Sequence, residues 1–301
     1  MKNKRSNSAS QLFNFTEESY LERTSRPIYA IIFLLPFIIF YELGTIFINT
    51  DLLNQTQVRV VAFVWMQDFL KCLGFGDKLA WMAPALAVVI ILISLQVASR
   101  KRWRFMFWDI WPMAVECILL AVPLIVLSLF LNSSAYPQAD PGRFQSSCDP
   151  IQTGMASSCF SVVKNSLLAM KTTTGTSDHR LLANFVTGIG AGIYEELIFR
   201  LILICILMTV FQYILRFNHK SSIIFSILIS AALFSAHHHI LFLNGQFASS
   251  TPFNWTEFGF RTIAGVYFAG LFAIRGFGIT AGTHAFYDII AVLINAVFFQ
   301  Q

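Results

Sequence analysis

Two adjacent glutamates and an arginine lie inside a strongly apolar part of the chain. Glu195, Glu196 and Arg200 interrupt an apolar run at 181–215. Two later apolar segments carry histidines and a further carboxylate, namely His237, His238, His239, His284 and Asp288. Carboxylates and histidines are common general acids and bases, and ionisable groups at membrane depth are costly and usually functional. The sequence therefore predicts an active site assembled from three apolar helices.

Composition places these residues in a membrane protein. Of 301 residues, 56% are hydrophobic and 12% are charged, which is unusual for a soluble domain. Segments that approach or exceed the ~20 residues needed to cross a bilayer lie at 28–48, 79–98, 111–131, 181–215, 223–243, 258–274 and 277–299. The predicted fold class is therefore all-α, a multi-spanning transmembrane bundle of about seven helices. The segment at 181–215 is long enough to be tilted or broken.

The segment at 58–75 is expected to form an additional amphipathic helix in the membrane interface. Its apolar residues are interrupted at roughly helical spacing by Arg59, Gln67, Asp68 and Lys71. About 27 polar residues precede the first long apolar segment, so no cleaved signal peptide is expected.

Basic residues predict the orientation in the membrane. They cluster at 2–26, 100–104 and 216–220 and at Arg275, and seven crossings place all four clusters on one side. The positive-inside bias then puts the N-terminus in the cytoplasm and the C-terminus outside, in an integral multi-pass protein of the cell inner membrane. Anionic lipid beside these clusters accounts for the net charge of +5, so no nucleic-acid partner is expected.

The longest polar connection, 132–180, then lies beyond the cytoplasmic face. It contains Cys148 and Cys159, which are expected to form a disulfide if that compartment is oxidising. The other three cysteines show no metal-ligand spacing and are expected to pack as apolar residues.

Helical geometry separates the two adjacent glutamates. Glu196 and Arg200 are four residues apart in the favourable order for an ion pair, whereas Glu195 is rotated by about 100°. The residues that precede Glu195 on its face are small: Gly188, Ala191 and Gly192. A second helix could approach closely along that face and bring a histidine within reach.

The histidines leave alternatives open. His284 and Asp288 share one helix face, where they form either part of an active site or a hydrogen-bonded pair between helices. The run 237–239 cannot share a face, so one member is expected to function and two to be solvated or supporting. At ~1.5 Å per residue, Glu195 lies about 21 Å from the start of its span, so tilt or a late helix start is needed to bring it level with this run.

Glu42 and Glu116 are expected to form structural ion pairs or line a polar cavity.

These residues resemble the CPBP or Abi family of CAAX-processing and bacteriocin-processing intramembrane proteases, which includes CAAX prenyl proteases. Glu195-Glu196 with Arg200 matches the motif Glu-Glu-x-x-x-Arg. Phe234 with His238 matches Phe-x-x-x-His, although Ala236-His237 also resembles the family's Ala-His ending. His284 with Asp288 matches the third motif, with Asp in place of Asn.

The resemblance implies a glutamic endopeptidase without a cofactor. Glu195 would activate a water with His238, and His284 with Asp288 would stabilise the oxyanion. Asp288 must then be protonated, or else orient His284. A third option is zinc held by His238, His284 and a carboxylate, although the motif His-Glu-x-x-His is missing.

The implied organisation is a cytoplasmic tail at 1–27, a transmembrane extension at 28–180 and a catalytic domain at 181–299. Its partners would be the lipid bilayer and a membrane-associated polypeptide substrate. Two other functions remain open. One is a non-catalytic immunity or scaffold protein of the same fold, and the other is a proton-coupled transporter, for which no internal repeat is evident.

Overall fold

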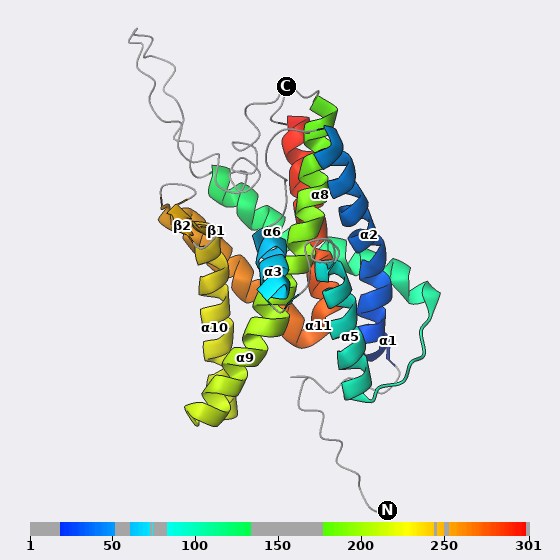
Figure 1. Ribbon diagram of the computed structural model, residues 1–301, viewed down its shortest axis with the longest axis vertical. Helices are drawn as coiled ribbons and strands as arrows, with labels where there is room; N and C mark the ends of the chain where they lie inside the picture. The colour runs from blue at the N-terminus through cyan, green and yellow to red at the C-terminus, as the bar shows by residue number, and fades with distance from the viewer. Residues whose placement is uncertain are drawn as a thin grey trace, which may run out of the picture.

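A computed structural model of the chain describes residues 19–51, 61–72, 74, 83–133, 177–243, 246–249 and 253–298 (Figure 1). The proposed cysteine pair, Cys148 and Cys159, lies outside the described residues. Most of the described chain is helical, and the prediction of an all-α bundle is confirmed.

The first half of the described chain contains α1 (Tyr20–Thr24), α2 (Pro27–Asp51), α3 (Val61–Cys72), α5 (Ala83–Ser99), the short η1 (Phe107–Asp109) and α6 (Ile110–Ser133). The second half contains α8 (Ser177–Glu196), η2 (Leu197–Leu203), α9 (Ile204–Thr209), η3 (Val210–Ile214), α10 (His219–His237), β1 (Ile240–Leu243), β2 (Gln246–Ser249) and α11 (Trp255–Phe298).

Five helical stretches among the described residues are long and apolar enough to cross a membrane, and the protein is an integral membrane protein. They lie at Pro27–Ile48, Phe107–Leu131, Leu181–Ile214, His219–His237 and Trp255–Val297. The last stretch contains two of the predicted spans, and α5 is a shorter apolar helix. These two facts account for the seven predicted segments.

A glycine separates the two halves of α11. Gly276 has φ 76° and ψ −178°, a conformation that side chains with a Cβ rarely adopt. A Cβ there would also lie 3.2 Å from the carbonyl oxygen of Ser25. In Figure 1, α11 runs from the β-hairpin to the lower part of the bundle, turns, and returns to its upper end. The second half can therefore turn back and pack against both α2 and α8.

The predicted helix at 223–243 ends earlier than expected. Helix α10 stops at His237, and residues 240–243 form β1, which pairs antiparallel with β2 so that Ile240 lies opposite Ser249. A short apolar run such as 240–243 fits a strand as well as a helix, so periodicity could not separate the two. The histidine run consequently lies at a helix end that joins a hairpin.

The amphipathic segment predicted at 58–75 is helical over α3. Ala62 and Phe63 are buried, whereas Asp68, Phe69 and Lys71 are exposed. Figure 1 shows α3 at mid-height in front of α8. Phe63 of α3 meets Tyr194 of α8 edge to face, with ring centres 4.9 Å apart, so the apolar face packs against the part of α8 that carries the glutamates.

The elements that carry basic residues lie at one end of the bundle. Helix α1, the end of α5, the turn before α10 and the bend in α11 all lie toward the lower end of Figure 1. Exposed aromatic residues typical of a membrane interface accompany them: Trp103, Phe107, Trp108 and Trp111. The described basic clusters thus lie at the same end, as predicted from the sequence. That this end faces the cytoplasm remains a prediction.

An ion-pair network joins α1 to the bend of α11 at this end. Arg275 donates from Nη2 to Glu116 Oε2 at 2.7 Å and to the Thr24 hydroxyl at 2.8 Å. Arg23 pairs with Asp109 at 3.1 Å. Glu116 therefore has the structural ion pair that was one of the roles expected from the sequence.

Candidate active site

Two glycines of α8 allow α11 to approach the adjacent glutamates. A Cβ on Gly192 would lie 2.5 Å from the backbone nitrogen of Ala285, and one on Gly188 would lie 2.8 Å from Asp288 Cβ. Real Cβ atoms essentially never come within 3.0 Å of such atoms, so larger residues would force the helices apart. The close packing predicted from the small residues is confirmed, and it sets the position of His284.

Glu196 links the two helices. Its Oε2 lies 3.1 Å from Arg200 Nε, and both side chains are fully buried. Its Oε1 accepts a hydrogen bond of 2.7 Å from His284 Nδ1. The ion pair with Arg200 was expected from their spacing, whereas the bond to His284 was not. The histidine that the close packing brings within reach thus binds Glu196.

Aromatic rings complete the surroundings of Arg200 and His284. The guanidinium carbon lies 4.1 Å from the ring centre of Phe234, and the guanidinium donates a 3.4 Å hydrogen bond to the carbonyl of Gly265. The imidazole of His284 stacks on Phe268 at 4.6 Å with 17° between the planes. Packing on one side and the Glu196 bond on another hold this ring in one orientation.

Asp288 lies beyond the other nitrogen of His284. Its Oδ2 is 3.7 Å from His284 Nε2, which is longer than a hydrogen bond. Its side chain keeps 24% of its surface exposed, compared with none for Glu196. Asp288 is therefore the more accessible of the two carboxylates that flank His284.

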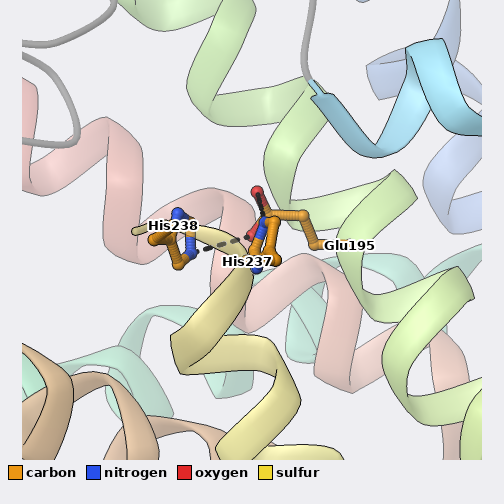
Figure 2. A group of neighbouring side chains, drawn as sticks. All are labelled: Glu195, His237 and His238. Atoms are coloured by element: carbon orange, nitrogen blue, oxygen red, sulfur yellow. Dashed lines mark ion pairs between the residues drawn. The ribbon is translucent and has the colours of Figure 1, made fainter. Parts of the chain in front are cut away.

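Glu195 faces a different pair of residues (Figure 2). Its Oε1 lies 3.5 Å from His237 Nε2, and its Oε2 lies 3.9 Å from His238 Nε2. The other ring nitrogen of His237, Nδ1, donates a 2.6 Å hydrogen bond to the carbonyl of Phe234. That bond fixes the proton on Nδ1 in the neutral ring and leaves a lone pair on Nε2, directed at the carboxylate.

Helix α10 brings these histidines to Glu195 because it is short. It rises from the lower end of the bundle and ends at the β-hairpin (Figure 1). Its Ser230 hydroxyl donates a 2.6 Å hydrogen bond to the carbonyl of Phe199. Phe199 lies in η2, a wider π-helical turn of the kind often found at functional sites. This contact joins the histidine helix directly to the turn that follows the glutamates.

The structure corrects one expectation about the histidine run. Two members, His237 and His238, face Glu195, where a single functional member was expected. His239 is not solvated, since it is 3% exposed and packs 5.0 Å from the Phe253 ring. The helix ends within the run, so its members do not follow the helical rotation assumed from the sequence.

The six predicted residues thus lie in two linked groups. Glu195 and His238 form the first, which also contains His237; the second consists of Glu196, Arg200, His284 and Asp288. Trp65 of α3 is a neighbour that the sequence did not indicate, with its ring 5.7 Å from that of His237. No pattern within 58–75 separates this tryptophan from the other apolar residues of its helix.

Metal-ligand geometry also favours the first group. The potential ligand atoms of Glu195, His237 and His238 all lie within 4.8 Å of one another. The zinc set considered from the sequence combined His238 with His284, and the Nδ1 of His284 is bonded to Glu196.

Comparison with known families agrees with the motifs. Residues 177–290 match the family described as type II CAAX prenyl endopeptidase, Rce1-like, which confirms the resemblance stated from the three motifs. The matched residues include both groups described above. No curated protein and no solved structure matches the chain.

Proposed function

We propose that this protein is an intramembrane endopeptidase that hydrolyses a peptide bond of a membrane-associated polypeptide through a water activated by Glu195. The match at 177–290 supports an endopeptidase of the CAAX-protease type. The observation that carries the proposed mechanism is the contact between Glu195 and His237 across 3.5 Å.

That contact brings two hydrogen-bond acceptors together. With Nδ1 bonded to Phe234, the neutral ring of His237 presents a lone pair to an ionised carboxylate. A water about 2.8 Å from each atom would donate one hydrogen to Glu195 and one to His237. Its own lone pair would then be free for a substrate carbonyl. His238 stays the residue indicated by motif spacing, while the shorter contact and the anchored ring favour His237.

The reaction would follow ordinary peptide hydrolysis. As the water oxygen bonds to the carbonyl carbon, one water proton passes to Glu195 and the carbonyl oxygen gains negative charge. Collapse of this intermediate breaks the carbon–nitrogen bond, and the proton is delivered to the leaving nitrogen. Glu195 is only 5% exposed, so the site is largely shielded from bulk water. This shielding strengthens electrostatic interactions within the site.

The second group would stabilise the oxyanion. Glu196 accepts from His284 Nδ1 and so orients the ring, with Nε2 on the side of Asp288. This orienting role is the one that Asp plays in a serine-protease triad, and here Glu196 performs it. Asp288 is then available as a protonated donor to the oxyanion, which is the role we propose for it.

Cleavage by purified protein in liposomes would test this function. The probes are a fluorogenic farnesylated peptide ending in Cys-aliphatic-aliphatic-X, the same peptide without farnesyl, and a library of membrane-anchored peptides read by mass spectrometry. We expect cleavage by wild type and by Glu257→Gln, a matched control whose glutamate pairs with Arg261. We expect none by Glu195→Gln. Folded wild type that cleaves no probe would favour the non-catalytic alternative.

A further inference from the structure

One histidine beside Glu195 is not needed for the proposed water activation. His238 Nε2 lies 3.9 Å from Glu195 Oε2, on the carboxylate oxygen that His237 does not approach. Figure 2 shows both imidazoles next to this carboxylate, and their ring centres lie 3.9 Å apart. Two nitrogens and a carboxylate therefore converge from the end of α10 and the end of α8.

These three groups form a ligand set that transition metals prefer. Two imidazoles and one carboxylate suit Zn²⁺, and such sets hold zinc in enzymes with a fourth position open. Tetrahedral bonds of about 2.1 Å separate ligand atoms by roughly 3.4 Å, close to the 3.5 Å between Glu195 and His237. Shifts on the order of 1 Å at the His238 ring would bring the remaining separations, at most 4.8 Å, to the same value.

The surroundings of His237 also fit a metal ligand. Metal-bound histidines generally donate their other ring N–H to a carbonyl or carboxylate, which fixes the ring orientation. Here His237 Nδ1 donates to the carbonyl of Phe234 at 2.6 Å. Glu195 and His237 are 5% and 6% exposed, so a cation would meet little competition from water. The His238 side chain is 13% exposed and supplies a more open side.

We propose that Glu195, His237 and His238 bind one divalent transition-metal ion such as Zn²⁺, and that the bound ion inhibits cleavage. Metal binding itself is independent of the proposed function, whereas the inhibition rests on it. Inhibition follows because a ligating Glu195 cannot accept a proton from water. The neighbouring Glu196 cannot replace it, since Arg200 and His284 hold both of its oxygens.

Metal content measures the binding directly. Purified full-length protein, first treated with chelator, is dialysed against Zn²⁺, and bound metal is counted by mass spectrometry. Co²⁺ serves as a second probe because its visible spectrum reports tetrahedral coordination. We expect one equivalent in wild type, at least tenfold weaker binding in His238→Ala and Glu195→Gln, and none with Mg²⁺, which prefers oxygen ligands.

His219→Ala is the matched histidine control. His219 is exposed at the start of α10 and contacts Gln212 at 3.0 Å, remote in sequence from the proposed ligands. We expect it to bind one equivalent as wild type does. No binding by wild type, or undiminished binding by a folded His238→Ala, would overturn the metal site. Thermal unfolding of each variant establishes that it is folded.

Cleavage assays separate this inference from the proposed function. We expect chelated wild type to cleave and one equivalent of Zn²⁺ to reduce the rate at least tenfold. Cleavage without Zn²⁺ binding would overturn the metal site alone. Zn²⁺ binding by a protein that never cleaves would overturn the proposed function and leave the site intact. Stimulation by Zn²⁺ would overturn the inhibitory role of the ion.

Discussion

Two of the regions that hold buried charges among the described residues differ in their contacts. At the basic end, Arg275 reaches Glu116 and Thr24 through hydrogen bonds of 2.7 and 2.8 Å. At mid-height, Glu195 faces His237 and His238 across 3.5 and 3.9 Å, too far for good direct hydrogen bonds. Short bonds hold helices together, whereas the separations at Glu195 suit groups that share one water or one metal ion as ligands.

The second glutamate combines both kinds of contact. Glu196 makes a 3.1 Å ion pair with Arg200, as the structural network does, but also orients His284 through a 2.7 Å bond. Adjacent glutamates thus have different tasks because a helix turns them toward different neighbours. Variants in each region can test whether the difference in contacts corresponds to a difference in role.

Removing the base should have the largest effect on cleavage. Glu195→Gln keeps the shape of the side chain but cannot accept a proton, so we expect a loss of about 10³-fold or more. Thermal unfolding should stay within a few degrees of wild type, since Glu195 makes no short bond to either histidine. Cleavage at the wild-type rate would show that another group is the base.

Breaking the structural network should instead lower stability. Arg275→Met leaves Glu116 without its bidentate partner, and we expect a loss of about 3 kcal/mol in the free energy of unfolding. Lys101→Met is the control, because Lys101 lies 3.7 Å from Glu22 with 26% of its side chain exposed, and should lose less than about 1 kcal/mol. A large fall in kcat with unchanged stability would contradict the structural role.

Glu196→Gln should affect both properties. It removes the negative charge beside the buried Arg200 and weakens the bond that orients His284, so we expect lower thermal stability and about 10²-fold slower cleavage. The rate should fall in kcat rather than KM, because orientation of His284 matters in the transition state. Loss of stability with normal kcat in the folded fraction would limit Glu196 to a structural role.

Paired histidine variants would assign the partner of Glu195. The anchored ring and shorter contact predict that His237→Ala slows cleavage about 10²-fold and that His238→Ala slows it less than about tenfold. His239→Ala supplies the comparison for loss of a buried imidazole outside the Glu195 contact. The reverse order for the first two variants would return the role to His238, as its motif spacing indicates.

The smallest effect is expected at Asp288. If it is a protonated donor, Asp288→Asn retains a donor and should keep cleavage within about tenfold, with less sensitivity to high pH. If it is an ionised partner of His284, the same change should reduce kcat steeply. A steep fall in kcat without any change in bound metal would rule out the donor role of Asp288.

Much of this protein was determined by its sequence because the relevant forces are local. Apolar length alone predicts helices, since a backbone in lipid must satisfy its own hydrogen bonds. The spacing of Glu196 and Arg200 places them on one face, and the small size of Gly188 and Gly192 indicates where a second helix approaches. The three motifs identified the family matched at 177–290.

Only the tertiary structure decided which residues meet. Helix rotation, depth and ends depend on the packing of several segments at once, and no single segment encodes them. Thus His284 binds Glu196, α10 stops level with Glu195, and a hairpin replaces the last turn expected after His239. The position of Trp65 beside His237 likewise depends on the packing of α3 against α8, which the amphipathic pattern of α3 leaves open.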